Sequence, residues 1–139
     1  MSINYPKSGP NSVPAYQLSG IPYVTSSASN EVTHDTVTQI SFPYVTRFFE
    51  VENTGGNALR YGFTQSGVTG SITQNYIILD GITIGSTYEL RCKDLFFMAE
   101  NPGETTSFRV VAGLTIIDRK EFPALTGSVG GVAAFEGVG

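Results

Sequence analysis

From residue 36 onward, turn-forming residues interrupt the chain about every ten residues, and this spacing limits the fold more than any other feature of the sequence. The runs between the turns are short and rich in β-branched and aromatic residues, as at residues 36–42 and 95–99. No stretch of about ten or more residues places apolar side chains at helical spacing. The sequence therefore predicts an all-β sandwich or barrel of about seven or eight strands.

The clearest hairpin signal lies at residues 47–63. Within 47–52, Phe49 and Val51 alternate with Glu50 and Glu52, and the turn 53–57 (Asn-Thr-Gly-Gly-Asn) supplies residue types that accept positive φ. Residues 59–63 then alternate again. We therefore expect 47–52 and 59–63 to pair as neighbouring strands.

The sequence of residues 65–117 predicts one loop and several strands. Residues 65–74, rich in Ser, Gly and Thr, are expected to form a loop. The apolar run 76–79 favours a strand buried on both faces, and 86–92 alternates like a strand with one solvated face. Residues 107–117 predict the longest strand, with these side chains sharing one face: Phe108, Val110, Ala112, Leu114 and Ile116.

Two terminal segments differ from this core. Residues 1–35 contain four prolines and spaced apolar groups, which predicts an extended N-terminal arm. Residues 119–139 form a Gly-rich, apolar C-terminal interaction tail, which leaves 36–118 as the sandwich domain. Because a small core cannot bury both segments, we expect them to bind partners. The expected partner-binding residues are Tyr5, Tyr16, Leu18, Ile21, Tyr23, Phe122, Leu125 and Phe135.

Composition excludes several classes of function. The net charge of −4 offers no basic surface for nucleic acid, so we expect no nucleic-acid partner. No apolar run reaches the ~18 residues of a membrane span, and the start of the chain does not resemble a secretory signal. We therefore expect assembly in the cytosol. The single cysteine and single histidine predict neither an internal disulfide nor a Cys/His metal site, and no cofactor is expected.

Catalytic constellations are sparse. His34 lies near several serines, but closeness in sequence does not orient an imidazole against a hydroxyl. Cys92 falls on the apolar side of its run, which favours a buried thiol over a nucleophile. Calcium ligation lacks a DxDxD-like spacing, and carboxylate pairs for glycoside hydrolysis are equally explained as solvated strand faces. We therefore expect no enzyme. The carboxylates considered were Glu50, Glu52, Asp80, Glu89, Asp94 and Glu100.

The order of strands and turns resembles that of small virion proteins. The segments that carry the resemblance are RFFEVEN (47–53), LRYGFT (59–64), YIILDG (76–81), residues 90–99 and FRVVAGLTI (108–116). Between residues 36 and 117 the chain is similar to single-domain, jelly-roll-like β-sandwich proteins that form minor capsid, vertex (penton) or decoration components of double-stranded DNA viruses and tailed phages. The resemblance implies an antiparallel jelly-roll-like sandwich with a structural role and no catalytic residues.

Two hypotheses of different classes follow. The main one is a structural virion protein, assembled in the host cytosol, that forms a homo-oligomer (trimer or pentamer). It would bind the major capsid protein or other virion proteins through its terminal segments. The alternative is a glycan-binding module or fibre head that uses Tyr44, Tyr76 and the loop at 65–74.

Overall fold

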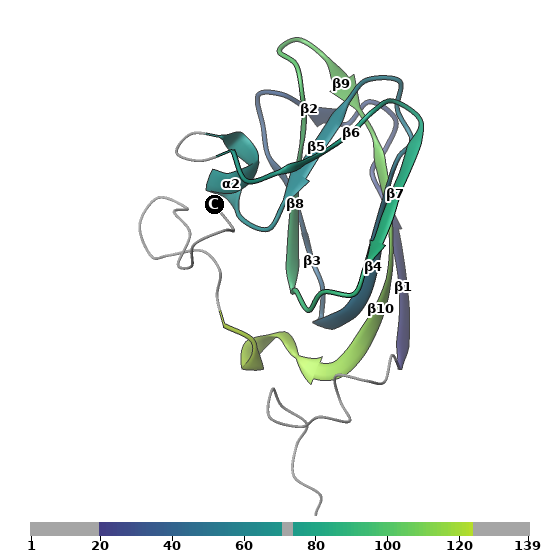
Figure 1. Cartoon of the computed structure of the whole chain (residues 1–139), viewed down its shortest axis with the longest axis vertical. Coiled ribbons are helices and arrows are strands. Elements are labelled where there is room, and N and C mark those ends of the chain that lie inside the picture. The colour runs from purple at the N-terminus through teal and green to yellow at the C-terminus, as the bar shows by residue number, and fades with distance from the viewer. Residues whose placement is uncertain (1–19, 71–73, 124–139) are drawn as a thin grey trace, which may run out of the picture.

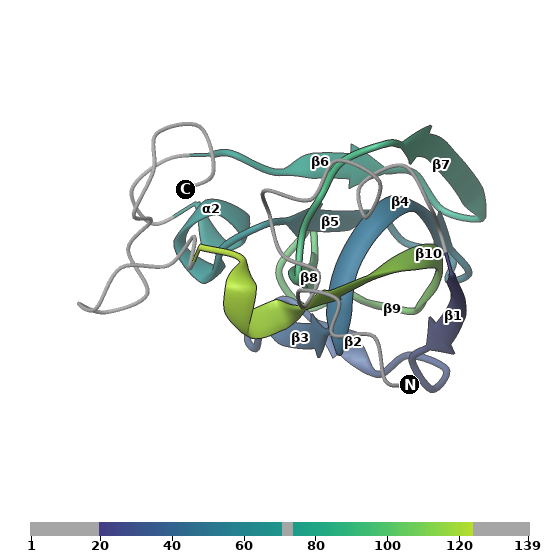
Figure 2. The same ribbon diagram turned by 90° about the horizontal axis from the view of Figure 1, so that it is seen from below.

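The computed structural model describes residues 20–70 and 74–123 (Figure 1). This part of the chain folds into two four-stranded antiparallel sheets, with a two-stranded ribbon beside them. The two four-stranded sheets form the layers of a sandwich, which Figure 2 shows end-on. The predicted all-β sandwich is confirmed.

The two layers differ in strand length. We call β1-β10-β4-β7 the long sheet and β3-β8-β5-β6 the short sheet. The long sheet contains β1 (Ile21–Ser26), β10 (Phe108–Asp118), β4 (Tyr44–Asn53) and β7 (Thr83–Tyr88). The short sheet contains β3 (Thr38–Ser41), β8 (Asp94–Ala99), β5 (Leu59–Gly62) and β6 (Ile77–Leu79). The remaining elements are the ribbon strands β2 (Val32–Thr33) and β9 (Thr105–Thr106), helix α2 (Gln65–Thr69) and a 3-10 turn, η1 (Arg119–Glu121).

Strand pairing follows a nested order. β1 pairs with β10, β2 with β9, β3 with β8, β4 with β7 and β5 with β6, all antiparallel. The two halves of the chain therefore pair like the two strands of one long hairpin that is rolled up. Two further pairings, of β10 with β4 and of β5 with β8, join these strand pairs into sheets. The eight strands of the two sheets, connected in this way, form a jelly roll.

The core lies between the two sheets. Phe97 of the short sheet stacks on Phe108 of the long sheet with a ring-centroid distance of 4.0 Å. Tyr61 and Phe49, from opposite sheets, are also fully buried. Each such aromatic side chain contributes roughly 2–3 kcal/mol through removal of its apolar surface from water. The two sheets are therefore held together mainly by aromatic packing.

The predicted hairpin at residues 47–63 is wrong, because β4 and β5 belong to different sheets. Neither Gly55 nor Gly56 adopts the positive φ that a tight reversal needs. Instead Asn53 is buried, and its Nδ2 donates to the carbonyl oxygens of Asn57 (2.7 Å) and Asp80 (2.9 Å). The Asn-Thr-Gly-Gly-Asn segment therefore connects the two sheets and is not a turn between two strands of one sheet.

Three local expectations also need correction. The expected loop at 65–74 contains α2, whose first turn is capped by Thr64 Oγ1 accepting from Gly67 N. The run 76–79 is not buried on both faces, since Ile78 is exposed. The expected strand at 86–92 is shorter, because β7 ends at Tyr88.

The longest strand changes face part of the way along. Phe108, Val110, Ala112 and Leu114 are buried as predicted, but register shifts after Gly113 and Leu114 interrupt the alternation. Ile116, expected on the core face, is instead 58% exposed, and Ile117 is buried against Val45.

The described parts of the expected arm and tail belong to the folded unit. β1, at residues 21–26, pairs along its whole length with β10. Beyond β10, Arg119 Nη2 binds Asp94 Oδ1 at 3.0 Å, and Lys93 Nζ donates to the carbonyl oxygen of Phe122 at 3.2 Å. The folded unit therefore extends beyond the predicted limits of 36 and 118 at both ends.

Candidate functional site

The central part of the outer face of the short sheet, on β5 and β8, is covered, whereas Gln39 on β3 and Ile78 on β6 are exposed. Helix α2 lies across the covered part (Figure 2), and its Val68 packs on the outward side chains of Phe96 and Met98. Val37 and Tyr76 close the margins of this small second core. Its apolar side chains are therefore unavailable to a partner.

Arg60 holds this cover in place. It stands on the outer face of β5, is only 7% exposed, and its Nε binds Glu100 Oε2 at 3.0 Å. Its Nη1 donates to the carbonyl oxygen of Val68 (3.1 Å) in α2, and its guanidinium lies 4.4 Å from the centroid of the Tyr76 ring. A buried, multiply bonded arginine of this kind fastens the helix to the sheet.

The outer face of the long sheet is open by contrast. Val24 of β1 pairs with Val111 of β10, and both side chains point outward, with 65% of Val24 exposed. Pro22 follows on the same face of β1, and Ile116 lies against Gly20 at the start of that strand. We call these four residues, Pro22, Val24, Val111 and Ile116, the β1–β10 strip.

The opposite edge of the sandwich carries a second exposed apolar set. Ile78 of β6, Ile82 of the connecting turn and Ile84 of β7 are all exposed, and Ile82 is the extreme at 79%. Ile82 also has φ +50°, which is sterically costly for a β-branched residue. We call these three residues the isoleucine edge. β1 and β7 are the two edge strands of the long sheet, so the strip and the isoleucine edge lie on opposite sides of the domain.

All four sheet edges have features that discourage strand addition. β1 contains Pro22, whose nitrogen has no hydrogen to donate to an added strand. β7 carries one extra residue opposite Glu50–Glu52 of β4, which makes a bulge. β3 has four residues and β6 has three. Contacts with a partner are therefore expected through exposed faces rather than through sheet extension.

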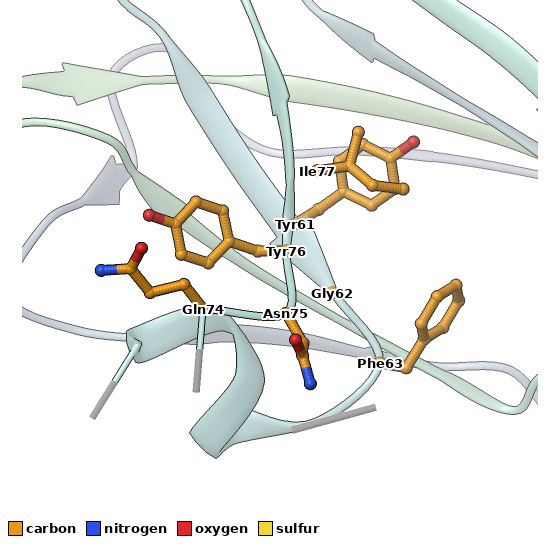
Figure 3. Close-up of a pocket in the computed structure, with 7 residues that line it drawn as sticks. All are labelled: Tyr61, Gly62, Phe63, Gln74, Asn75, Tyr76 and Ile77. Atoms are coloured by element: carbon orange, nitrogen blue, oxygen red, sulfur yellow. The ribbon is translucent and has the colours of Figure 1, made fainter. Parts of the chain in front are cut away.

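A shallow pocket of about 320 Å³ opens where β5 and the segment before β6 diverge (Figure 3). Its lining combines three aromatic residues with two amides. The Phe63 ring meets Phe49 edge-on with a centroid distance of 6.0 Å, which fixes Phe63 from the core side. Seven residues line the pocket: Tyr61, Gly62, Phe63, Gln74, Asn75, Tyr76 and Ile77.

Burial makes two potential reactive groups inert. Burial raises the pKa of the Cys92 thiol from 9.0 to about 12, and the nearby Thr46 hydroxyl only partly offsets this effect. Burial also raises the pKa of the Tyr61 phenol, with Tyr88 adding to the shift. A thiol that stays protonated at neutral pH is a poor nucleophile. His34 Nδ1 lies 3.0 Å from the carbonyl oxygen of Ala99.

The candidate carboxylates are mostly engaged in structural contacts. Glu52 binds Arg109 at 3.0 Å, Asp94 binds Arg119 and Glu100 binds Arg60. Glu50 accepts from Thr87 Oγ1 at 2.8 Å, and Glu89 lies 3.8 Å from Arg47, while Asp80 is exposed next to the isoleucine edge. Within residues 20–70 and 74–123, no three His, Cys, Asp or Glu side chains come together as a metal site.

The predicted partner-binding residues have different fates. Ile21 and Tyr23 are half-buried against their own core, and Tyr23 meets Phe42 edge-on at 5.2 Å. Phe122 packs on the cluster of Val45 and Ile117. Their role in partner binding stays a prediction. The other five lie outside the described residues: Tyr5, Tyr16, Leu18, Leu125 and Phe135.

Sequence reasoning missed the β1–β10 strip and the isoleucine edge. Val111 was visible on the second face of the longest run, but the exposure of Ile116 depends on a register shift that the residues alone do not show. Val24 was assigned to the arm, so its pairing with Val111 was not foreseen.

Comparisons with known proteins do not extend this description. No protein-family model, curated protein or solved structure matches the chain. No helix within the described ranges is long and apolar enough to cross a membrane. Because a jelly roll hosts many unrelated functions, function has to be argued from the exposed residues of this chain.

Proposed function

We propose that this protein is a non-enzymatic structural component of a virion, a minor capsid, vertex or decoration protein, that assembles head to tail with copies of itself. The observation that carries the proposal is the pair of exposed apolar surfaces on opposite edges of the jelly roll, the β1–β10 strip and the isoleucine edge. A strip that meets the isoleucine edge of the next copy makes a heterologous contact. Such contacts close into a ring when the rotation between copies allows it, which agrees with the expected trimer or pentamer.

The character of both surfaces supports a second copy as the partner. The chain carries a net charge of −4, so two copies repel each other wherever their acidic residues meet. The strip and the isoleucine edge consist of apolar side chains only. Copies therefore approach best through these two surfaces.

Two further features favour a structural role. Jelly rolls are the recurrent domain of viral shells, although lectins and cupins share the topology. The strained φ of Ile82 keeps an apolar side chain in solvent, which is costly for an isolated domain and useful at an interface. The terminal segments 1–19 and 124–139 would then bind the major capsid protein or other virion proteins.

The test of self-assembly is native mass measured by analytical ultracentrifugation across micromolar concentrations. We expect a discrete trimer or pentamer for the natural chain and monomers for both Val24→Lys and Ile82→Lys. A matched control, Gln39→Lys on an exposed position of the short sheet, should assemble normally. A natural chain that stays monomeric throughout contradicts the proposal.

A mixing experiment tests the head-to-tail geometry. Val24→Lys keeps the isoleucine edge intact, and Ile82→Lys keeps the strip intact, so an equal mixture should form a one-to-one dimer that neither variant forms alone. Absence of this dimer, while the natural chain assembles, would rule out the strip-to-edge contact.

The virion assignment has a separate test. Virus particles from the source of the chain, purified by density gradient after nuclease treatment, should contain it in a fixed ratio to the major shell protein. A variant that lacks residues 1–19, which end before β1, should fold but stay out of the particles. Normal incorporation of this variant would remove the N-terminal segment from the proposal.

A further inference from the structure

The pocket beside β5 and β6 has a lining that the structural role does not use. Its volume of about 320 Å³ is at the lower end of the range of ~300–1,000 Å³ typical of small-molecule sites. Among the described residues, no ionised side chain lines it. A ligand that fits this pocket is therefore small, and its recognition does not depend on charge.

Contacts with neighbouring side chains of the fold hold Phe63 and Tyr76 of the lining in place. Phe63 rests edge-on against Phe49 of the core, and the Tyr76 ring stacks with the guanidinium of Arg60. Both Phe63 and Tyr76 remain half-buried, so part of each is still exposed. Rings fixed in this way contact a ligand without a large loss of side-chain entropy.

The amides of the lining are free to bind. Gln74 is exposed and Asn75 half-buried, and neither side chain makes a hydrogen bond to any described residue. Figure 3 shows both where the chain leads into β6, with the Gln74 side chain on the same side as Tyr76. An amide offers one acceptor and two donors, which complements a hydroxyl group because a hydroxyl also donates and accepts.

We infer that this pocket is a binding site for one or two units of a neutral saccharide. Phe63 packs on the core between the sheets, whereas Tyr76 and Gln74 lie on the outer side of the short sheet beside Gly70. A sugar ring has an apolar C–H face, which packs on one of these two aromatic rings, and hydroxyl groups, which bind the amide nearest to that ring. The absence of an ionised group from the lining favours a neutral sugar over an acidic one. The site lies between β5 and the segment before β6, away from the β1–β10 strip and next to the isoleucine edge, since Ile77 lines it and Ile78 belongs to that edge.

The experiment titrates the full chain with maltose, lactose, methyl mannoside and diacetylchitobiose up to tens of millimolar, a range suited to weak sites. Amide proton–nitrogen correlation spectra report binding. We expect saturable shifts at the side-chain amide of Gln74 or of Asn75 with at least one sugar. Replacing the shifted amide with alanine, Gln74→Ala or Asn75→Ala, should weaken binding about fivefold, the effect of roughly one hydrogen bond.

Two controls make the result decisive. Gln65→Ala changes an exposed glutamine of α2 outside the lining and should leave the affinity unchanged. Tyr76→Phe keeps the ring against Arg60 and tests the phenol alone. Absence of saturable shifts with all four sugars overturns the inference. So does an unchanged affinity of the matching alanine variant, or binding only of a proline-rich peptide, another ligand suited to aromatic grooves.

Discussion

The two sheets present similar faces to the core and different faces to the outside. The short sheet carries α2 across its outer face and buries Phe96, Met98 and Arg60 beneath it. The long sheet leaves Val24 and Ile116 exposed, without a covering element among the described residues. The central part of one outer face is thus covered within the chain, and the other face is available for contact with a partner.

Two arginines illustrate the difference. Arg60 and Arg109 both stand on outer sheet faces, and both pair with a glutamate at 3.0 Å. The Arg60 side chain is 8% exposed and also binds backbone carbonyls, whereas the Arg109 side chain is 50% exposed. The same ion pair is therefore part of the fold on one sheet and a solvated surface contact on the other.

The largest expected effect comes from removing the buried arginine. Arg60→Met should lower the free energy of unfolding by about 3 kcal/mol, because the Glu100 carboxylate and the α2 carbonyls lose their partner. Arg109→Met, the matched change on the open face, should cost at most about 1 kcal/mol. Urea unfolding monitored by circular dichroism measures both. Equal losses would mean that the two faces do not differ in this way.

Substitutions of apolar side chains should show the same contrast between the two outer faces, with smaller changes in the free energy of unfolding. Met98→Ala leaves a cavity under Val68 and should cost about 2 kcal/mol. Ile116→Ala changes an exposed side chain and should stay within about 0.5 kcal/mol. The midpoints of urea unfolding compare the two variants at micromolar protein. A large loss for Ile116→Ala alone would show that the strip is needed for folding.

The pH dependence of the free energy of unfolding tests the burial of Cys92 in the core. The pKa of Cys92 is raised to about 12 in the folded chain, so above pH 9 the unfolded chain releases a proton that the folded chain keeps. The free energy of unfolding should therefore be unaffected by this group below pH 9. Above it, the free energy should fall by up to about 1.4 kcal/mol per pH unit. Cys92→Ala should show a shallower decline, and an identical slope would contradict the burial argument.

The smallest effect is expected for the exposed ion pair itself. Glu52→Gln removes the partner of Arg109 and should change the free energy of unfolding by about 0.5 kcal/mol or less. The change should disappear at about 1 M salt, because screening shortens the range of exposed charges to ~3 Å. A salt-independent loss would indicate that this face is less solvated than its exposure suggests.

Strand content was readable from the sequence because alternation and turn residues are local signals. Residues 95–99 and 107–117 were found close to β8 and β10. The partner of each strand was not readable, as the failed hairpin at 47–63 shows. The chain crosses from one sheet to the other after Asn53, whose side chain donates hydrogen bonds to the carbonyl oxygens of Asn57 and Asp80. These bonds form only in the finished fold, so the sequence alone does not show them.

Less of the candidate surfaces could be predicted. The exposure of Ile116 follows from register shifts between β10 and β4, and that of Val24 from its place on an edge strand. The short α2 gives no periodic signal over its five residues. The sequence predicts Tyr76 in a strand buried on both faces and as a residue of the alternative glycan site, whereas its ring lies against Arg60 on the outer face of the short sheet.

The nested pairing of the strands also determines when the domain is able to fold. β5 and β6, at the centre of the chain, are separated only by residues 63–76, which contain α2, whereas β1 must wait for β10, the last strand among the described residues. Contacts so distant in sequence slow folding, and they leave β1 without a partner during synthesis. We therefore expect the nascent chain to close from its middle outward, with the β1–β10 strip formed last. Copies would then become competent for assembly only after synthesis is complete.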